Sequence, residues 1–118
     1  MKMVELKKNG QTLIRKCRIA ADFFTRFLGL MGKMQLREDE ALCFPKCNSI
    51  HTFFMRIPID VLFVSKSGKV IEVLPTLKPW KMLLPRLKAA HVIEMKSALA
   101  AKLEISVGDQ LEIAGVFE

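Results

Sequence analysis

Residues 47–64 read Cys-Asn-Ser-Ile-His-Thr-Phe-Phe-Met-Arg-Ile-Pro-Ile-Asp-Val-Leu-Phe-Val. β-Branched and aromatic residues dominate this stretch, and they favour a half-buried pleated surface. Pro58 cannot donate a hydrogen bond within a sheet, so we predict two strands, 48–55 and 59–64, with a bend at 56–58 between them. Antiparallel pairing about this bend would place His51, Met55 and Asp60 on one face. We therefore expect this pair of strands to form the centre of a sheet.

The rest of the chain alternates short apolar runs with turn signals. Asn9-Gly10 suits the positive-φ positions of a tight turn and predicts a hairpin between strands 3–7 and 12–20. Further strands are predicted at 41–44, 70–74, 91–95 and 111–117. Three prolines within residues 75–85 predict a loop.

Two helices are expected. Asp22 can cap a helix over 22–32, and Ser97 can cap a short one over 97–102. About eight short strands with one clear helix favour a mainly β protein with minor α content, an antiparallel β-sandwich or barrel. The alternative is a ferredoxin-like α+β sheet, which would need a second substantial helix.

Length and composition indicate one globular domain, residues 1–118. Hydrophobic residues make up 51% of the chain and charged residues 26%, which favours a folded globule over a disordered chain. The three cysteines are an odd count, which argues against a secreted disulfide framework and for a reducing compartment. No apolar run has the length of a signal peptide or of a membrane span of about 18 residues. We therefore expect a cytoplasmic protein without a membrane partner.

A ladder of soft metal ligands recurs every four residues: Cys43, Cys47, His51 and Met55. In a strand, four residues span roughly 13 Å, so neighbours in the ladder cannot share an ion with bond lengths of about 2.0 to 2.3 Å. A bend at 45–46 could still bring the two cysteines together. We predict no metal site and no cofactor.

Polar residues of several chemistries lie among the apolar strands, as is typical of a ligand pocket. Our candidates for ligand binding are Arg26, His51, Thr52, Met55 and Asp60. The alternative is a hydrolase that uses His51 with Asp60 or a cysteine, which requires a partner of the histidine within hydrogen-bond reach. No nucleophile elbow of the Gly-x-Ser-x-Gly type surrounds Ser49, so we favour a noncatalytic domain that binds a small ligand or a protein partner.

A third hypothesis is nonspecific nucleic-acid binding. The 19 basic and 12 acidic residues give a formal charge of +7, which attracts phosphates. An aromatic side chain among cations can stack a base and contact phosphates. The candidates lie in the proline-rich loop: Lys78, Trp80, Lys81, Arg86 and Lys88. Such a tryptophan more often belongs partly to the core, and scattered lysines are usually solvated, so nucleic acid is not the favoured partner.

Several motifs occur together in one order along the chain. They are Arg-Phe-Leu-Gly-Leu-Met-Gly at 26–32, Cys-Asn-Ser-Ile-His-Thr-Phe-Phe-Met at 47–55, Ile-Asp-Val-Leu-Phe at 59–63, Gly-Lys-Val at 68–70, Val-Ile-Glu at 92–94 and Gly-Asp at 108–109. In these motifs the chain resembles the bacterial and archaeal family called domain of unknown function 192. The resemblance implies a compact β-rich sandwich similar to a jelly roll, and it supplies no activity. Where that family usually has a glycine after the Leu-Glu strand, this chain reads Met-Lys-Ser-Ala at 95–98.

Overall fold

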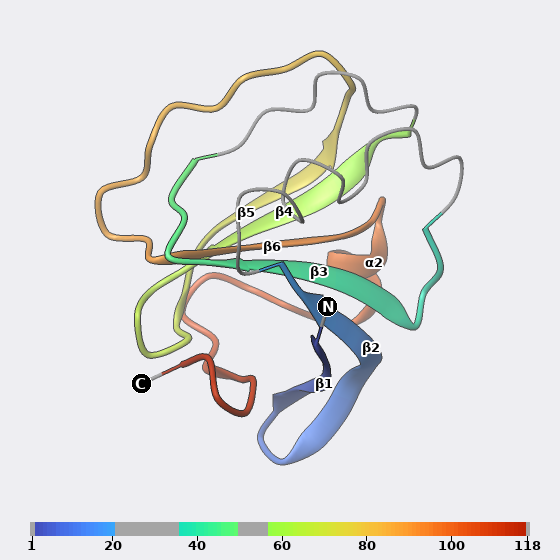
Figure 1. The fold of residues 1–118 in the computed structure, drawn as a ribbon. Coiled ribbons are helices and arrows are strands. Elements are labelled where there is room, and N and C mark those ends of the chain that lie inside the picture. Colours follow the sequence, from blue (N-terminus) through green and yellow to red (C-terminus); the bar gives the residue numbers. More distant parts are fainter. Residues whose placement is uncertain (1, 21–35, 50–56, 118) are drawn as a thin grey trace.

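The computed structural model describes residues 2–20, 36–49 and 57–117. Within these ranges seven strands form one sheet of order β5-β4-β6-β3-β2-β1-β7, which curls into a half-barrel (Figure 1). The elements are β1 Lys2–Lys8, β2 Gln11–Ile19, β3 Glu40–Pro45, β4 Ile59–Val64, β5 Val70–Leu77, β6 His91–Lys96, the short helix α2 Leu99–Lys102, and β7 Leu111–Glu112. The predicted mainly β class is confirmed, while the helix predicted at 22–32 lies outside the described residues.

The predicted hairpin is confirmed as β1 and β2. Asn9 and Gly10 have φ angles of 53° and 75°, which fits a turn that needs positive φ at both central residues. Most strand pairs of the described sheet are antiparallel, as predicted. The pair β2–β3 is parallel, with Cys17 opposite Ala41. The long connection through residues 20–39 permits this parallel pairing, which a tight turn does not.

Strand β4 lies inside the sheet with a partner on each side. Val61 pairs with Leu74 of β5 on one side and with Glu94 of β6 on the other. The pairing predicted between 48–55 and 59–64 is therefore wrong, because both edges of β4 are already occupied. All six residues of β4 are buried, and its two partners are β5, which follows through the turn at 65–69, and the distant strand β6. Residues 50–55 themselves lie outside the described ranges.

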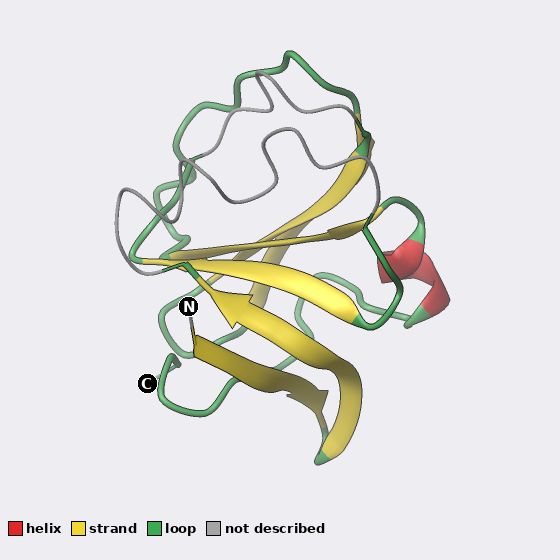
Figure 2. Cartoon of the chain, turned by 45° about the vertical axis from the view of Figure 1, so that its right-hand side comes forward, coloured by secondary structure: helices red, strands yellow, loops and turns green. Residues whose placement is uncertain are grey.

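The two faces of the sheet carry separate apolar clusters. Alternate residues of β4 and β6 contribute to each, as the two-residue period of a strand requires. The first cluster includes Leu62, Ile93 and residues of α2, and the second includes Val61 and Phe63. Figure 2 shows α2 at the side of the sheet and the loop 78–90 above the sheet. Residues of this loop pack against the second cluster, so α2 and the loop belong to opposite faces.

Two predicted boundaries differ from the structure. Strand β5 continues through Pro75 to Leu77, which an edge strand tolerates because its outer N–H groups need no partner in the sheet. The strand predicted at 111–117 ends after Glu112, since a turn follows and brings Phe117 onto the ring of His91 with 5.4 Å between centroids. The loop predicted after Pro75 begins at residue 78. In the described part of the chain, no helix is long and apolar enough to cross a membrane.

Candidate functional site

Asp60 is the one ligand-binding candidate that lies within the described residues, since Arg26, His51, Thr52 and Met55 fall outside them. Its side chain is completely buried, and its carboxylate accepts three backbone N–H groups. Thr76 and Ala98 donate to Oδ1 at 2.8 and 3.0 Å, and Ala100 donates to Oδ2 at 2.9 Å. Asp60 thus ties the end of β5 and the start of α2 to the interior strand β4.

The predicted cap of the short helix is wrong. Ala98, with φ of 71°, occupies the N-cap position of α2 and makes no side-chain hydrogen bond there. The hydroxyl of Ser97 instead contacts that of Thr76, with 2.7 Å between the oxygens. The carboxylate of Asp60, distant in sequence, accepts the N–H groups that a local cap would otherwise satisfy.

A hollow of about 400 Å³ opens at the opposite end of β4. Its lining residues are Lys46, Cys47, Asn48, Ser49, Ala89 and Ala90. Cys47 packs against the second cluster, whereas Asp60 shares the face of Leu62 and Val64 in the first. The hollow and Asp60 are therefore separated by the sheet.

Backbone hydrogen bonds hold the wall of this hollow. Cys47 N donates to Ala90 O at 2.9 Å, and Arg86 N donates to Asn48 O at 2.9 Å. Lys46 N donates to Nδ1 of the buried His91 at 3.2 Å. The segment after β3 is thereby fixed against the C-terminal part of the loop 78–90 and the first residue of β6.

The hollow is rich in hydrogen-bond donors. The thiol of Cys47 donates to Ser49 O at 2.9 Å. The ammonium of Lys46, the side-chain amide of Asn48 and the hydroxyl of Ser49 have no hydrogen bond or ion pair within the described protein. Donors that converge on a concave surface can receive the oxygens of a bound anion. None of these three residues was singled out from the sequence as a ligand-binding candidate, although the motif at 47–55 contains two of them.

Glu94 is a buried carboxyl group on the same face as the hollow. It lies on β6 between Leu42 and Val61, and only 5% of its surface is exposed. Burial raises its pKa to about 8, so the neutral acid predominates at pH 7. The alternation along 91–95 could have revealed this carboxyl, because it places Glu94 on the same face as Val92.

The cysteines differ in their access to solvent. Cys17 and Cys43 are buried, Cys47 is half-buried, and all three are free thiols. Burial raises the pKa of Cys17 to about 12, which makes it a poor nucleophile at neutral pH. Among the described residues no group of three or more His, Cys, Asp or Glu side chains could hold a metal ion.

Of the five nucleic-acid candidates, Arg86 is already engaged within the protein. Its Nε donates to Glu72 at 2.8 Å, its NH1 donates to Leu84 O at 2.6 Å, and its guanidinium lies 4.9 Å from the ring centroid of Phe63. It anchors the loop to the sheet. The other four candidates are exposed: Lys78, Trp80, Lys81 and Lys88.

Replacing Arg86 with alanine is expected to lower the free energy of unfolding by about 1 to 2 kcal/mol, because a charge-assisted hydrogen bond and a cation–π contact are lost together. Urea denaturation measures the change. The matched control is Lys88→Ala, at an exposed cation of the same loop, which should stay within about 0.5 kcal/mol of the parent protein. Equal effects of the two substitutions would contradict the anchoring role of Arg86.

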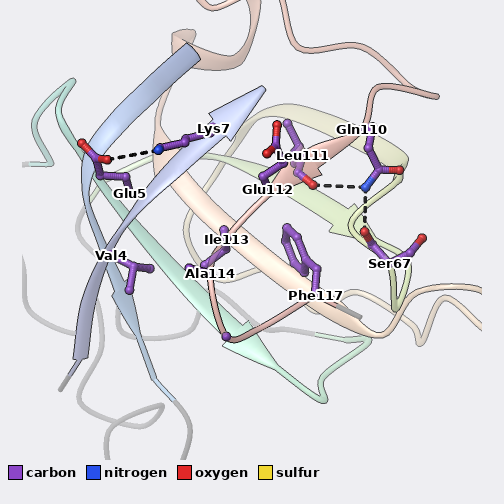
Figure 3. Close-up of a pocket in the computed structure, with 11 residues that line it drawn as sticks. Val4, Glu5, Lys7, Ser67, Gln110, Leu111, Glu112, Ile113, Ala114 and Phe117 are labelled. Atoms are coloured by element: carbon purple, nitrogen blue, oxygen red, sulfur yellow. Dashed lines mark hydrogen bonds and ion pairs between the residues drawn. The ribbon is translucent and has the colours of Figure 1, made fainter. Parts of the chain in front are cut away.

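A second hollow, of about 600 Å³, lies between β1 and the segment that follows β7 (Figure 3). Much of its polar lining is already paired. Glu5 and Lys7 form an ion pair at 3.7 Å, and the amide of Gln110 donates to Ser67 O at 2.6 Å. It is therefore a weaker ligand site than the smaller hollow, whose donors remain available.

Sequence comparison finds a match over most of the chain. A family model described as "Uncharacterized ACR", DUF192, matches residues 4–113. A UPF0127 protein of Pyrococcus furiosus is 34% identical over 109 residues, which cover 87% of this chain and 90% of that protein. A UPF0127 protein of Pyrococcus horikoshii is 38% identical over 101 residues, or 80% and 84% of the two chains.

Two solved structures share the fold. A protein of unknown function from Novosphingobium aromaticivorans aligns with a TM-score of 0.80 and 24% identity, over 93% of this chain and 84% of that one. A protein from Sinorhizobium meliloti, named as a candidate transcription regulator, aligns with a TM-score of 0.79 and 23% identity, over 95% and 92%. At these identities the likeness concerns the fold alone.

Proposed function

Because the chain belongs to the DUF192 family of uncharacterised proteins, we propose from its own geometry that it is a noncatalytic domain that binds a small anionic ligand. The binding site is the hollow beside Cys47, which borders the motif at 47–55. The observation that carries this proposal is the set of available donors on Lys46, Asn48 and Ser49 around a concave surface. A ligand that carries a carboxylate or a phosphate would complement them.

The size of the hollow supports the proposal that its ligand is a small molecule. A volume of about 400 Å³ lies in the usual range for ligand pockets, roughly 300 to 1,000 Å³. Ala89 and Ala90 contribute only methyl groups to its lining, so a larger side chain at either position would reduce the space. The candidates His51 and Thr52 come soon after Ser49 in the sequence and lie outside the described residues.

A substitution that fills the hollow should weaken binding strongly. Ala90→Leu is expected to weaken the binding of inorganic phosphate, citrate or another small carboxylate at least tenfold, and Asn48→Ala should weaken it by a similar factor because a donor is lost. Ligand-observed NMR and thermal shift with these probes measure the change.

The matched control is Ala101→Leu, which adds the same side chain at an exposed position of α2 and should leave binding unchanged. The proposal fails if none of these anions binds the parent protein, or if Ala90→Leu binds them as well as the parent does.

The hydrolase alternative has little support from the described residues. The carboxylate of Asp60 already accepts three N–H groups, so it is poorly placed to orient a catalytic histidine. Cys17 and Cys43 are buried, which leaves Cys47 as the accessible thiol. These observations support the noncatalytic proposal. We also propose that the protein acts as a single domain in the cytoplasm, where its three free cysteines would remain reduced.

A further inference from the structure

The loop 78–90 exposes an unusual number of large apolar side chains. Trp80 is 60% exposed, Met82 66%, Leu84 75% and Leu87 93%. Single exposed apolar residues are normal on a protein surface, but four within eight residues of one loop are an unusual concentration, which indicates an interaction site. We call these four residues the apolar ridge. The loop that carries them lies at the outer rim of the molecule (Figure 1).

The apolar ridge is held outward by contacts on the inner side of the loop. Leu83, between two ridge residues, is partly buried against the second cluster, and Ala89 is buried in it. Arg86 fastens the same segment to Glu72 of β5. The loop is therefore anchored to the sheet at three positions among or beside the ridge residues.

The charged side chains of the loop itself are all basic. Lys78, Lys81 and Lys88 are exposed in the same loop, and no acidic residue occurs between Glu72 and Glu94. A surface that combines aromatic and aliphatic side chains with lysines matches the interface of an anionic lipid bilayer. There the apolar groups enter the headgroup region, and the ammonium groups attract lipid phosphates.

We infer that the loop 78–90 docks the protein on an anionic membrane surface, with the apolar ridge inserted and the three lysines at the phosphates. The expectation from sequence that no membrane is involved rested on the absence of a spanning segment, which surface docking does not need. Association with a second copy would bring like charges together across the interface. Nucleic acid would use Trp80 for stacking and leave Met82, Leu84 and Leu87 in water.

Cosedimentation of the full chain with lipid vesicles tests this inference. We expect association with phosphatidylglycerol vesicles that weakens with salt, and little association with pure phosphatidylcholine. The variant Trp80→Ser/Leu84→Ser/Leu87→Ser should lose at least 90% of the bound fraction. Changing Lys78, Lys81 and Lys88 to glutamine should lower the partition coefficient about 100-fold, since each lysine near the surface contributes about fivefold.

Matched controls distinguish the contribution of the ridge from the contributions of exposed apolar residues elsewhere and of net charge. Met3→Ser/Val107→Ser removes exposed apolar groups elsewhere, and Lys2→Gln/Lys66→Gln/Lys69→Gln removes three charges outside the loop; both should bind nearly as the parent does. The inference is overturned if phosphatidylglycerol vesicles do not bind the protein or if the ridge variant binds them equally. It is also overturned if single-stranded nucleic acid binding or self-association, but not vesicle binding, depends on the ridge. Because binding of phosphate at the Cys47 hollow is measured without vesicles, failure of either proposal leaves the other standing.

Discussion

Replacing Asp60 with alanine is expected to lower the free energy of unfolding by about 4 kcal/mol, the largest effect of any single substitution considered. The carboxylate accepts N–H groups of Thr76, Ala98 and Ala100 at a site without solvent exposure. Hydrogen bonds to a charged group contribute about 1.5 to 3 kcal/mol each, and three donors left without an acceptor add their desolvation cost, although such terms are not additive.

Urea denaturation monitored by circular dichroism measures the loss. Asp60→Asn should have an intermediate effect of about 2 kcal/mol, because the amide keeps one oxygen acceptor and places an NH₂ group where the other stood. Asp39→Ala is the control: the carboxylate of Asp39 forms ion pairs at 3.7 Å on the surface, so its removal should change stability by less than about 1 kcal/mol. A loss below 1 kcal/mol for Asp60→Ala would refute the structural role.

Replacing Glu94 with glutamine is expected to remove a strong pH dependence of stability. The carboxyl has a pKa of about 8 in the folded protein and its ordinary pKa of 4.5 in the unfolded chain. At a pH between these two pKa values, the unfolded chain has released a proton that the folded protein retains. The free energy of unfolding therefore falls as the pH rises from about 4.5 to 8, and it is constant above pH 8. The limiting slope is about 1.4 kcal/mol per pH unit, or about 3 kcal/mol between pH 4.5 and 7.

Chemical denaturation at several pH values measures this dependence. The difference in stability between Glu94→Gln and the parent should shift in favour of the variant by about 3 kcal/mol from pH 4.5 to 7. Glu5→Gln, at an exposed position of β1, should shift by less than about 0.5 kcal/mol over the same range. If the free energies of unfolding of the parent and Glu94→Gln changed in parallel with pH, the pKa of this carboxyl would be the same in the folded and unfolded states.

Local signals in the sequence predicted much of the sheet. The Asn9-Gly10 dipeptide determined the first hairpin because few residue pairs accept positive φ twice in succession. Strands were located where β-branched runs end at glycine or proline, and the loop after β5 followed from its prolines. The candidate site could be predicted only in part, since the motif at 47–55 directed attention to this region but not to the donors of Lys46, Asn48 and Ser49 as a group.

The sequence by itself therefore determined the class of fold, most of the described strand positions and the family, all of which depend on residue type and short-range spacing. Tertiary structure alone decided which distant strands are neighbours: β4 pairs with β6 on the side away from β5, and no local turn encodes that pairing. It also decided that Asp60 caps a helix about 40 residues away, that Glu94 is buried and that the apolar ridge is exposed. The physical reason is that burial and hydrogen-bond partners are properties of the packed chain, and residues distant in sequence supply them.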